Sequence, residues 1–319
     1  MKKILFFIFP ILLFSFYSCG ILQSESDPMP IHQEGYANRI YSVNIDGSNL
    51  KFLSIGDAYI TSRTADTIFI QSNDSIYSAN YDGSNKHLLT PGSYQKFWLS
   101  SGKNKVCLHQ YPSYNNYFIN TDGSGLTKLN LVYPAVDTWD ISPSGDKVVF
   151  SCSNGLFIAN IDGSNTIMLN NPVSSLHFSP DGNYIVYNQQ VYLSTTTSLF
   201  IYNLQSGLTT KIFPDYVDYD LSLNKILFTS SGGVYLYDIG NKTNSLLTSG
   251  GSAHFSADGS RFASFNVNQS MNIYDLNSFS TVSVTSINMP QVFCYNPHIT
   301  PGNNGLIFQS DSTYYLSKK

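Results

Sequence analysis

Charged residues are scarce in this chain. Lys and Arg number 17 and Asp and Glu 21 among 319 residues, so that charged residues make up 12% and the formal net charge is -4. This balance offers no basic surface, which argues against nucleic acid or an anionic lipid surface as a partner. Solubility therefore depends on neutral polar side chains, and Ser, Asn, Thr and Tyr recur throughout.

Cysteine is also rare, with 4 residues in the chain. Cys107, Cys152 and Cys294 are irregularly spaced, so neither a disulfide framework nor a C-x-x-C metal motif is present. We expect these three to be buried thiols that pack as small apolar residues, and we expect no metal and no cofactor. A bridge between Cys107 and Cys152 is the less favoured alternative, since both fall on expected strands of successive repeats.

The apolar run at the N-terminus is too short to cross a membrane, which takes about 20 apolar residues. The stretch "MKKILFFIFPILLFSFYSCG" begins with two lysines, continues with apolar residues from Ile4 to about Phe16, and ends in small or neutral residues around Cys19. Pro10 would break a helix there. This anatomy predicts a signal peptide over residues 1–18.

The sequence "FYSC" at residues 16–19 resembles the relaxed lipobox of bacterial lipoproteins, although Phe16 stands where Leu is commoner. The resemblance implies that Cys19 is lipidated and anchors the chain to a membrane of the cell envelope. An ordinary secretory signal, cleaved near Cys19 without acylation, is the alternative. Gly20 follows the cysteine in place of Asp, which favours the outer membrane and leaves open whether the protein faces the periplasm or the exterior. Residues 19–35 contain prolines and polar residues and are predicted to be a flexible tether.

One turn sequence recurs along the rest of the chain. It reads "NIDGSN" at residues 44–49, "NYDGSN" at 80–85, "NTDGSG" at 120–125 and "NIDGSN" at 160–165, with more diverged copies around Asn203, Asp238 and Asp275. Successive copies are separated by about 35 to 41 residues. That interval is the period of a β-propeller blade.

Each repeat contains two predicted β-hairpins. Short apolar and aromatic strands flank the recurring turn, whose Asp-Gly pair permits the positive φ angles of a tight connection. A second hairpin is clearest in "LHFSPDGNYIVYN" at residues 176–188. Two hairpins give four antiparallel strands, and such a sheet must stack against its neighbours to bury both faces.

The innermost strands occur about seven times, which predicts an all-β, seven-bladed propeller over residues 36–319. A hairpin at residues 39–53 lacks its first half, and a hairpin at residues 297–316 lacks its last strand. We therefore expect these two end segments to complete one blade and close the ring, which also removes exposed sheet edges. Six or eight blades are alternatives, because the copy near Tyr59 is weak and "TYYLSKK" duplicates a strand that the N-terminus also offers.

The "SPDG" turn at residues 179–182, its variants "SPSG" and "SADG", and the recurring "NIDGSN" resemble the TolB-type propeller repeat, a WD-repeat-like Pro-Asp repeat. The resemblance covers nearly everything after residue 35 and implies a propeller fold. It does not imply a function, because propellers host many activities. TolB carries a further α/β domain for which this chain has no room.

Signatures of catalysis are missing. The repeat also occurs in the regulatory propellers of prolyl-peptidase-type enzymes, but no G-x-S-x-G elbow occurs in this chain and no catalytic residue is assigned. The sequence therefore favours a non-catalytic scaffold that binds an unknown envelope protein or glycan, as a monomer. The alternative is a propeller enzyme, a carbohydrate-active lyase or hydrolase, that uses histidines and aspartates near the central channel as acid and base.

Those histidines and aspartates occupy equivalent positions on the expected innermost strands. Where one repeat has Trp98, the following repeats have Asp140, His177, Asp220, His254 and His298. Equivalent positions lie at equal radius in a propeller, so these side chains are predicted to form a partial ring near the channel. A structural hydrogen-bond network between blades is the favoured interpretation, with a ligand or metal site as the alternative. The first interpretation predicts that His177 and His254 lie within hydrogen-bond reach of Asp140 or Asp220.

Aromatic residues mark a second candidate site. The segments "YPSYNNYF" at residues 111–118 and "QQVYLSTTTSLF" at 189–200 are expected to lengthen the connections of two repeats. Loops on rigid scaffolds commonly carry recognition, and Tyr combined with Asn and Ser suits it. Tyr111, Tyr114 and Tyr117 are therefore candidates for a binding loop that recognises a glycan or a peptide. Because tyrosine is common in the whole chain, the favoured interpretation is that they are ordinary aromatic residues at strand edges.

Overall fold

The computed structural model describes residues 39–310, apart from short internal gaps at residues 57, 62–65, 73, 95, 103, 111–112, 134–135, 137, 191–196, 215, 223, 231–232, 250, 252, 257, 266–270, 279, 285–293, 301 and 303. The chain divides into two units, Met1–Gly35 and Tyr36–Lys319. The predicted signal peptide, lipidated Cys19 and tether lie outside the described residues.

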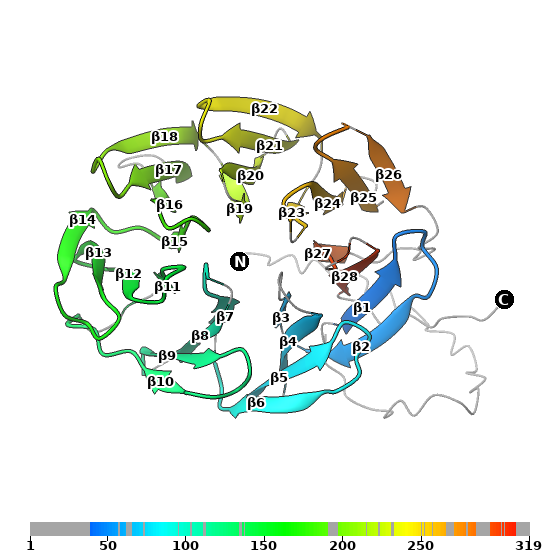
Figure 1. Cartoon of the computed structure of the whole chain (residues 1–319), viewed down its shortest axis with the longest axis horizontal. Helices are drawn as coiled ribbons and strands as arrows, with labels where there is room; N and C mark the ends of the chain where they lie inside the picture. The colour runs from blue at the N-terminus through cyan, green and yellow to red at the C-terminus, as the bar shows by residue number, and fades with distance from the viewer. Residues whose placement is uncertain are drawn as a thin grey trace, which may run out of the picture. The chain divides into compact units, whose positions relative to one another are not determined.

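The second unit is a β-propeller. Seven four-stranded antiparallel sheets form a ring, and every element of the described residues is a β-strand (Figure 1). In the view down the ring, the first strand of each blade lies nearest the centre and the fourth at the rim. The predicted fold class is confirmed. The blade count is also confirmed, and the alternatives of six and eight are excluded.

The strands follow one order, from the centre of each blade to its rim. Blade 1 contains β3 (Ala58–Thr61), β4 (Thr67–Ser72), β5 (Ser75–Asn80) and β6 (His87–Pro91), and blade 2 contains β7 (Lys96–Leu99), β8 (Lys105–Gln110), β9 (Asn115–Asn120) and β10 (Thr127–Lys128). Blade 3 contains β11 (Thr138–Ile141), β12 (Lys147–Cys152), β13 (Gly155–Asn160) and β14 (Ile167–Asn170), and blade 4 contains β15 (Ser175–Phe178), β16 (Tyr184–Gln190), β17 (Thr197–Asn203) and β18 (Thr209–Pro214). Blade 5 contains β19 (Tyr216–Ser222), β20 (Lys225–Ser230), β21 (Gly233–Asp238) and β22 (Thr243–Thr248), and blade 6 contains β23 (Ala253–Phe255), β24 (Arg261–Phe265), β25 (Met271–Asp275) and β26 (Thr281–Val284).

Blade 7 joins the two ends of the described chain. Its order is β27 (Cys294–Ile299), β28 (Gly305–Ser310), β1 (Arg39–Asn44) and β2 (Lys51–Ile55). β1 pairs with β28 along its whole length, from Arg39 opposite Ser310 to Asn44 opposite Gly305. The predicted closure is therefore confirmed. β28 and β1 each pair with a strand on both sides, so neither leaves an unpaired edge where the two ends of the chain meet.

The four Asp-Gly copies of the recurring turn, at residues 44–49, 80–85, 120–125 and 160–165, share one geometry. In the copy that connects β1 and β2, the backbone N–H of Asn44 donates to the carbonyl of Ser48 at 2.9 Å, and the Ser48 hydroxyl donates to Asp46 Oδ1 at 2.6 Å. Gly47 has a φ of 80° and Asn49 a φ of 55°, which explains why residues that tolerate the left-handed region stand there. The Ser48 hydroxyl and N–H stabilise the carboxylate and lower the pKa of Asp46.

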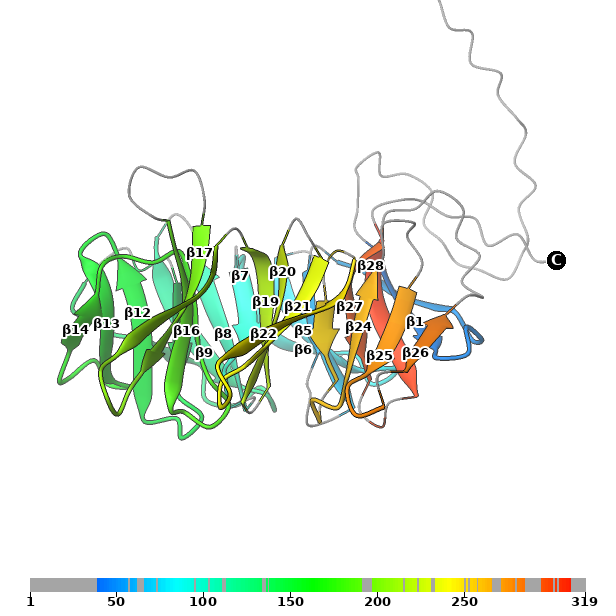
Figure 2. The same cartoon turned by 90° about the horizontal axis from the view of Figure 1, so that it is seen from above.

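Antiparallel order assigns every connection to one of two faces. The connections between first and second strands and between third and fourth strands, such as residues 142–146 and 161–166, lie on one side of the ring. We call this side the turn face. The opposite side carries the connections between second and third strands, such as residues 111–114 between β8 and β9, and the links from blade to blade. We call it the loop face. The strands run between these faces (Figure 2). The repeated Asp-Gly turns therefore lie on the turn face, and the connections that vary in sequence lie on the loop face.

Apolar side chains fill the space between neighbouring blades. Between blades 2 and 3, Trp139 and Phe150 pack with Cys107 and Cys152 in one buried cluster. Both cysteines are free thiols, so the alternative of a bridge between them is excluded. Burial raises the pKa of the Cys107 thiol well above its usual value, which keeps it protonated and unreactive. The side chain of Cys294 lies outside the described part of the structure.

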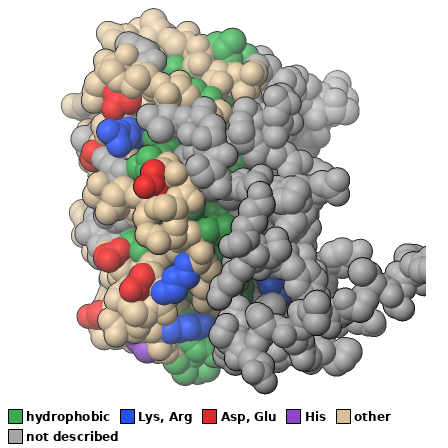
Figure 3. All heavy atoms as spheres, turned by 90° about the vertical axis from the view of Figure 1, so that its right-hand side faces the viewer, with side chains coloured by type: hydrophobic (Ala, Val, Ile, Leu, Met, Phe, Trp, Pro, Cys, Tyr) green, Lys and Arg blue, Asp and Glu red, His purple; other side chains and the backbone are tan. Residues whose placement is uncertain are grey.

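The outer surface of the ring carries scattered charges. On the described part of the side seen in Figure 3, acidic and basic side chains are interspersed among uncharged atoms and do not gather into a patch of one sign. This agrees with the small share of charged residues, 12%, in the sequence.

Candidate functional site

The predicted channel residues occupy one register position on the innermost strands. Each lies opposite the third residue of the second strand of its blade, as Asp140 lies opposite Val149 and His177 opposite Val186. Asp220, His254 and His298 lie opposite Leu227, Ala263 and Ile307 in the same way. The five residues thus line consecutive blades 3 to 7, and Trp98 of β7 takes the same position in blade 2.

Asp140 is fully buried, and its carboxylate connects three blades. Oδ1 accepts the N–H of Ile141 at 2.8 Å and the N–H of Ser101, on the turn of blade 2, at 3.3 Å. Oδ2 accepts the N–H of Phe178 on β15 of blade 4 at 3.0 Å. The Ser101 hydroxyl lies 2.5 Å from the same Oδ2 and 2.7 Å from the Phe178 carbonyl oxygen. Hydrogen bonds to an ionised carboxylate are stronger than neutral ones, so Asp140 fixes the register of blades 2, 3 and 4.

Asp220 repeats this arrangement two blades further on. Its Oδ1 accepts the N–H of Leu221, and its Oδ2 accepts the N–H of Phe255 on the next blade, each at 2.8 Å. In both cases the receiving strand contributes the N–H of the residue that follows a histidine. Asp140 and Asp220 therefore link neighbouring blades through equivalent hydrogen bonds.

The histidines stand beside these carboxylates. His177 Nδ1 lies 3.4 Å from Asp140 Oδ2, and His254 Nδ1 lies 3.8 Å from Asp220 Oδ2. These are ion-pair distances, longer than the hydrogen bonds of Asp140 Oδ2 to the Ser101 hydroxyl and the Phe178 N–H and that of Asp220 Oδ2 to the Phe255 N–H. The side chain of His177 is 36% exposed to the channel, whereas that of His254 is 14% exposed. The ring of His254 stacks on that of His298 with centroids 4.3 Å apart.

Trp98 lies at the other end of the partial ring. Its indole meets that of Trp139 edge-on, with ring centroids 5.1 Å apart. Its Nε1 is buried and has no hydrogen-bond partner among the residues that the structure describes. The wall of the channel is thus aromatic at blade 2 and polar from blade 3 to blade 7.

The tyrosines of the predicted binding loop do not lie together in one loop. Tyr111 lies outside the described residues. β9 begins at Asn115, so Tyr117 belongs to a strand, where it packs into the cluster between blades 1 and 2 and meets Tyr94 edge-on at 6.4 Å. Tyr114 lies in the connection on the loop face and is 38% exposed. The connection spans the four residues 111–114, and the second predicted loop is confined to residues 191–196, outside the described residues.

A buried polar network next to Tyr114 was not anticipated from the sequence. Asn116 Oδ1 lies 2.8 Å from both Trp139 Nε1 and His109 Nδ1, and all three residues are buried. One signal was available. Asn116 stands opposite the fifth residue of its neighbouring strand, and other blades have Ile76 or Leu156 at that position. A polar residue in a column of buried apolar residues indicates a specific partner.

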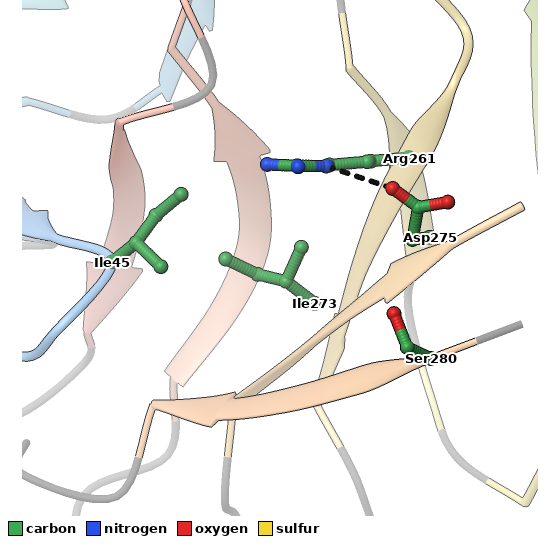
Figure 4. Close-up of a pocket in the computed structure, with 5 residues that line it drawn as sticks. All are labelled: Ile45, Arg261, Ile273, Asp275 and Ser280. Carbon is green, nitrogen blue, oxygen red and sulfur yellow. Dashed lines mark hydrogen bonds and ion pairs between the residues drawn. The ribbon is translucent and has the colours of Figure 1, made fainter. Parts of the chain in front are cut away.

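A small pocket of about 70 Å³ lies at the boundary of blades 6 and 7 and is lined by Ile45, Arg261, Ile273, Asp275 and Ser280 (Figure 4). Arg261 Nε lies 3.3 Å from Asp275 Oδ2. The same register position holds Lys105 with Asn120 and Lys147 with Asn160, joined at 2.8 and 2.6 Å. The Arg261–Asp275 pair is therefore one copy of a bond that recurs between second and third strands, and we assign it a structural role.

Within residues 39–310, as far as they are described, no three His, Cys, Asp or Glu side chains are arranged to hold a metal ion. The described residues also contain no helix long and apolar enough to span a membrane.

Comparison with known proteins supports the fold. No protein-family model matches the chain, and no curated protein matches it in sequence. Among solved structures, hydrazine synthase of Kuenenia stuttgartiensis is similar with a TM-score of 0.50 and 12% identity, over 68% of this chain and 75% of that one. TolB of Acinetobacter baumannii is similar with a TM-score of 0.50 and 13% identity, over 86% of this chain and 64% of that one. At such low sequence identity, structural similarity supports a shared fold and nothing about function.

Proposed function

We propose that this protein is a lipoprotein of the bacterial cell envelope, anchored through Cys19, whose TolB-like propeller is a non-catalytic scaffold that binds an envelope protein or a glycan. The lipidation rests on the sequence "FYSC" at residues 16–19, behind a short apolar run. Gly20, which follows Cys19 in place of Asp, supports the outer membrane as the location.

The observation that carries the scaffold role is the bonding of Asp140. Both of its oxygens accept backbone N–H groups, and the residue is 0% exposed. A general acid or base must reach the proton that it transfers, and a carboxylate sealed between blades does not reach a substrate. Asp220 is bonded in the same manner. These bonds support a role of Asp140 and Asp220 in holding neighbouring blades together. Such a role favours the scaffold over the propeller enzyme.

Recognition is assigned to the loop face. On the turn face, blades 7, 1, 2 and 3 repeat one Asp-Gly turn between their third and fourth strands, whereas the connections on the loop face differ in length and sequence from blade to blade. Sequence-variable connections on a rigid ring are where binding residues concentrate.

Two experiments on the full-length protein test the proposal. Growth with an alkyne-bearing fatty acid is expected to label the wild type and not Cys19→Ser; equal labelling of both would remove the anchor. For binding, a photo-crosslinking amino acid is placed at Ser113 or Asn154 on the loop face, and at Asn85 or Asn165 on the turn face as matched exposed controls. Adducts in cells are expected from the loop face only, and adducts of equal yield from both faces, or from neither, would contradict the scaffold role.

A further inference from the structure

The end of the β8–β9 hairpin on the loop face carries no charged side chain. From His109 to Asn120 the sequence "HQYPSYNNYFIN" contains no Lys, Arg, Asp or Glu. A partner of strong charge gains no complementary contact at such a surface. A ligand that this hairpin recognises should therefore be neutral and rich in hydrogen-bonding groups.

The buried network behind the hairpin fixes the protonation pattern of His109. An indole N–H only donates, so the Asn116 atom that lies 2.8 Å from Trp139 Nε1 must be the amide oxygen. The same oxygen lies 2.8 Å from His109 Nδ1, so Nδ1 carries the proton of the neutral ring and donates it. The remaining Asn116 amide N–H points to the Val136 carbonyl at 3.5 Å.

The consequence is an oriented acceptor. In this tautomer the lone pair of the His109 imidazole lies on Nε2, which has no hydrogen-bond partner among the described residues. His109 is 3% exposed and is fixed by a buried amide, so its lone pair is held in one direction at little entropic cost when a donor arrives. The acceptor lies within two residues of the connection on the loop face.

Tyr114 places an aromatic ring beside this acceptor. Its ring meets that of His109 edge-on, with centroids 6.1 Å apart, and 38% of the residue is exposed. Its φ is 54°, a left-handed conformation that is unfavourable for a tyrosine. Asp74, which also directly precedes a third strand, has a φ of 55°, so the turn tolerates a small polar residue at this position. Strain of this kind persists where the residue serves another purpose.

We propose that this site, formed by His109 and Tyr114, binds a neutral carbohydrate. The ring of Tyr114 packs against the C–H face of a sugar, and Nε2 of His109 accepts a hydrogen bond from one hydroxyl group. An uncharged ligand of many hydroxyl donors and apolar C–H faces matches a surface with one fixed acceptor, one ring and no charge. The proposal rests on the scaffold function above and names the class of ligand for its loop face.

The test titrates the full-length protein in detergent, labelled with nitrogen-15 at histidine, with maltohexaose, laminarihexaose, chitohexaose and mannohexaose. We expect at least one of them to shift the Nε2 resonance of His109 in proportion to occupancy. Tyr114→Asn should weaken that binding by about tenfold or more, while Tyr114→Phe, which keeps the ring, should stay within about threefold of the wild type. Asp74→Asn, at the equivalent turn of blade 1, should leave the affinity unchanged.

The outcomes separate this inference from the scaffold function. Tyr114→Asn keeps a residue that suits the backbone angle, so a folded variant is expected and lost binding is attributable to the ring. Absence of a shift with all four oligosaccharides, or equal affinity of Tyr114→Asn and wild type, overturns the carbohydrate site. If adducts to a protein still form at Ser113 in that case, the scaffold function stands and its ligand is a protein.

Discussion

The carboxylate of Asp140 accepts the backbone N–H of Phe178 at 3.0 Å, although the two residues are 38 positions apart and belong to different blades. Asp220 and Phe255 have the same relationship at 2.8 Å. These contacts join first strands, which otherwise lie side by side around the channel without sharing a sheet. The polar residues of the channel thereby contribute to the stability of the ring.

Replacement of Asp140 by Asn is expected to destabilise the protein. The amide keeps one acceptor oxygen and places an N–H₂ group against donors, so the free energy of unfolding should fall by about 1.5–3 kcal/mol, the range for hydrogen bonds to a charged group. Urea unfolding followed by tryptophan fluorescence measures the change. Asp122→Asn, in an exposed turn where Ser124 supplies the hydrogen bonds, is the control and should cause a much smaller loss. Equal losses for the two variants would show that Asp140 is not a bond between blades.

The stability of the ring should depend on pH in the acid range. The pKa of Asp275 is lowered from 3.8 to about 2. The hydrogen bond from the backbone N–H of Ser278 has the largest effect, followed by that from the backbone N–H of Asn277. A pKa that is lower in the folded state means that its stabilisation is complete above pH 3.8 and is lost as the pH falls toward 2. The pKa values of four turn aspartates are lowered as well, chiefly by the hydroxyl of the following Ser, and they add to this loss: Asp46, Asp82, Asp122 and Asp162.

Asp275→Asn isolates one of these contributions. The variant should have a lower urea midpoint than the wild type at neutral pH, and the two midpoints should approach each other between pH 3.8 and about 2. Midpoints at a series of pH values measure the difference. A difference that stays constant across this range would show that the carboxylate charge does not stabilise the turn.

Gly163 and Gly145 separate two effects of a glycine in a turn. Both have a positive φ, 86° and 81°, but a Cβ on Gly163 would lie 2.1 Å from the Asn130 carbonyl oxygen of blade 2, whereas a Cβ on Gly145 would meet nothing within 4 Å. Gly145→Ala should lower the free energy of unfolding by about 1 kcal/mol through backbone strain alone. Gly163→Ala should lower it by about 1–3 kcal/mol more, because the neighbouring blade must move. Thermal and urea unfolding of both variants checks this, and equal losses would mean that the turn does not pack against blade 2.

The architecture could be predicted because its signals are local and repeated. An Asp-Gly pair permits a positive φ whatever lies elsewhere in the chain, and Gly47 and Gly163 have that conformation. The period of the turns predicted the propeller blades. The incomplete hairpins at the two ends of the chain predicted that these ends pair and close the ring. The weak copy at residues 58–61 still forms an innermost strand, which pairs with β4 from Ala58 opposite Gln71 to Thr61 opposite Ile68.

Contacts between residues that are distant in the sequence were harder to predict. The sequence predicted His177 near Asp140, and the two do lie 3.4 Å apart. The hydrogen bonds of Asp140, however, come from the Ser101 hydroxyl and from main-chain N–H groups, and a main-chain N–H group leaves no trace in the sequence because every residue but proline has one. Tyr117 was assigned to a loop by composition, whereas packing against blade 1 places it in a strand. The network of His109, Asn116 and Trp139 spans two blades and depends on side-chain directions that no local pattern contains.

All of these relationships depend on closure of the ring by the two ends of the chain. Arg39 and Ser310 are Cα partners across β1 and β28, and antiparallel partners lie about 4.5–5.5 Å apart, within the range of a disulfide. The double variant Arg39→Cys and Ser310→Cys should form an intramolecular disulfide in high yield under mild oxidation, detected as one linked peptide by mass spectrometry. The pair Arg39→Cys and Ser72→Cys, in which Ser72 belongs to the neighbouring blade, is the control. Efficient linkage of the first pair and not the second is the predicted result, whereas absence of the intramolecular link, or equal linkage of both pairs, would contradict the closed seven-bladed ring.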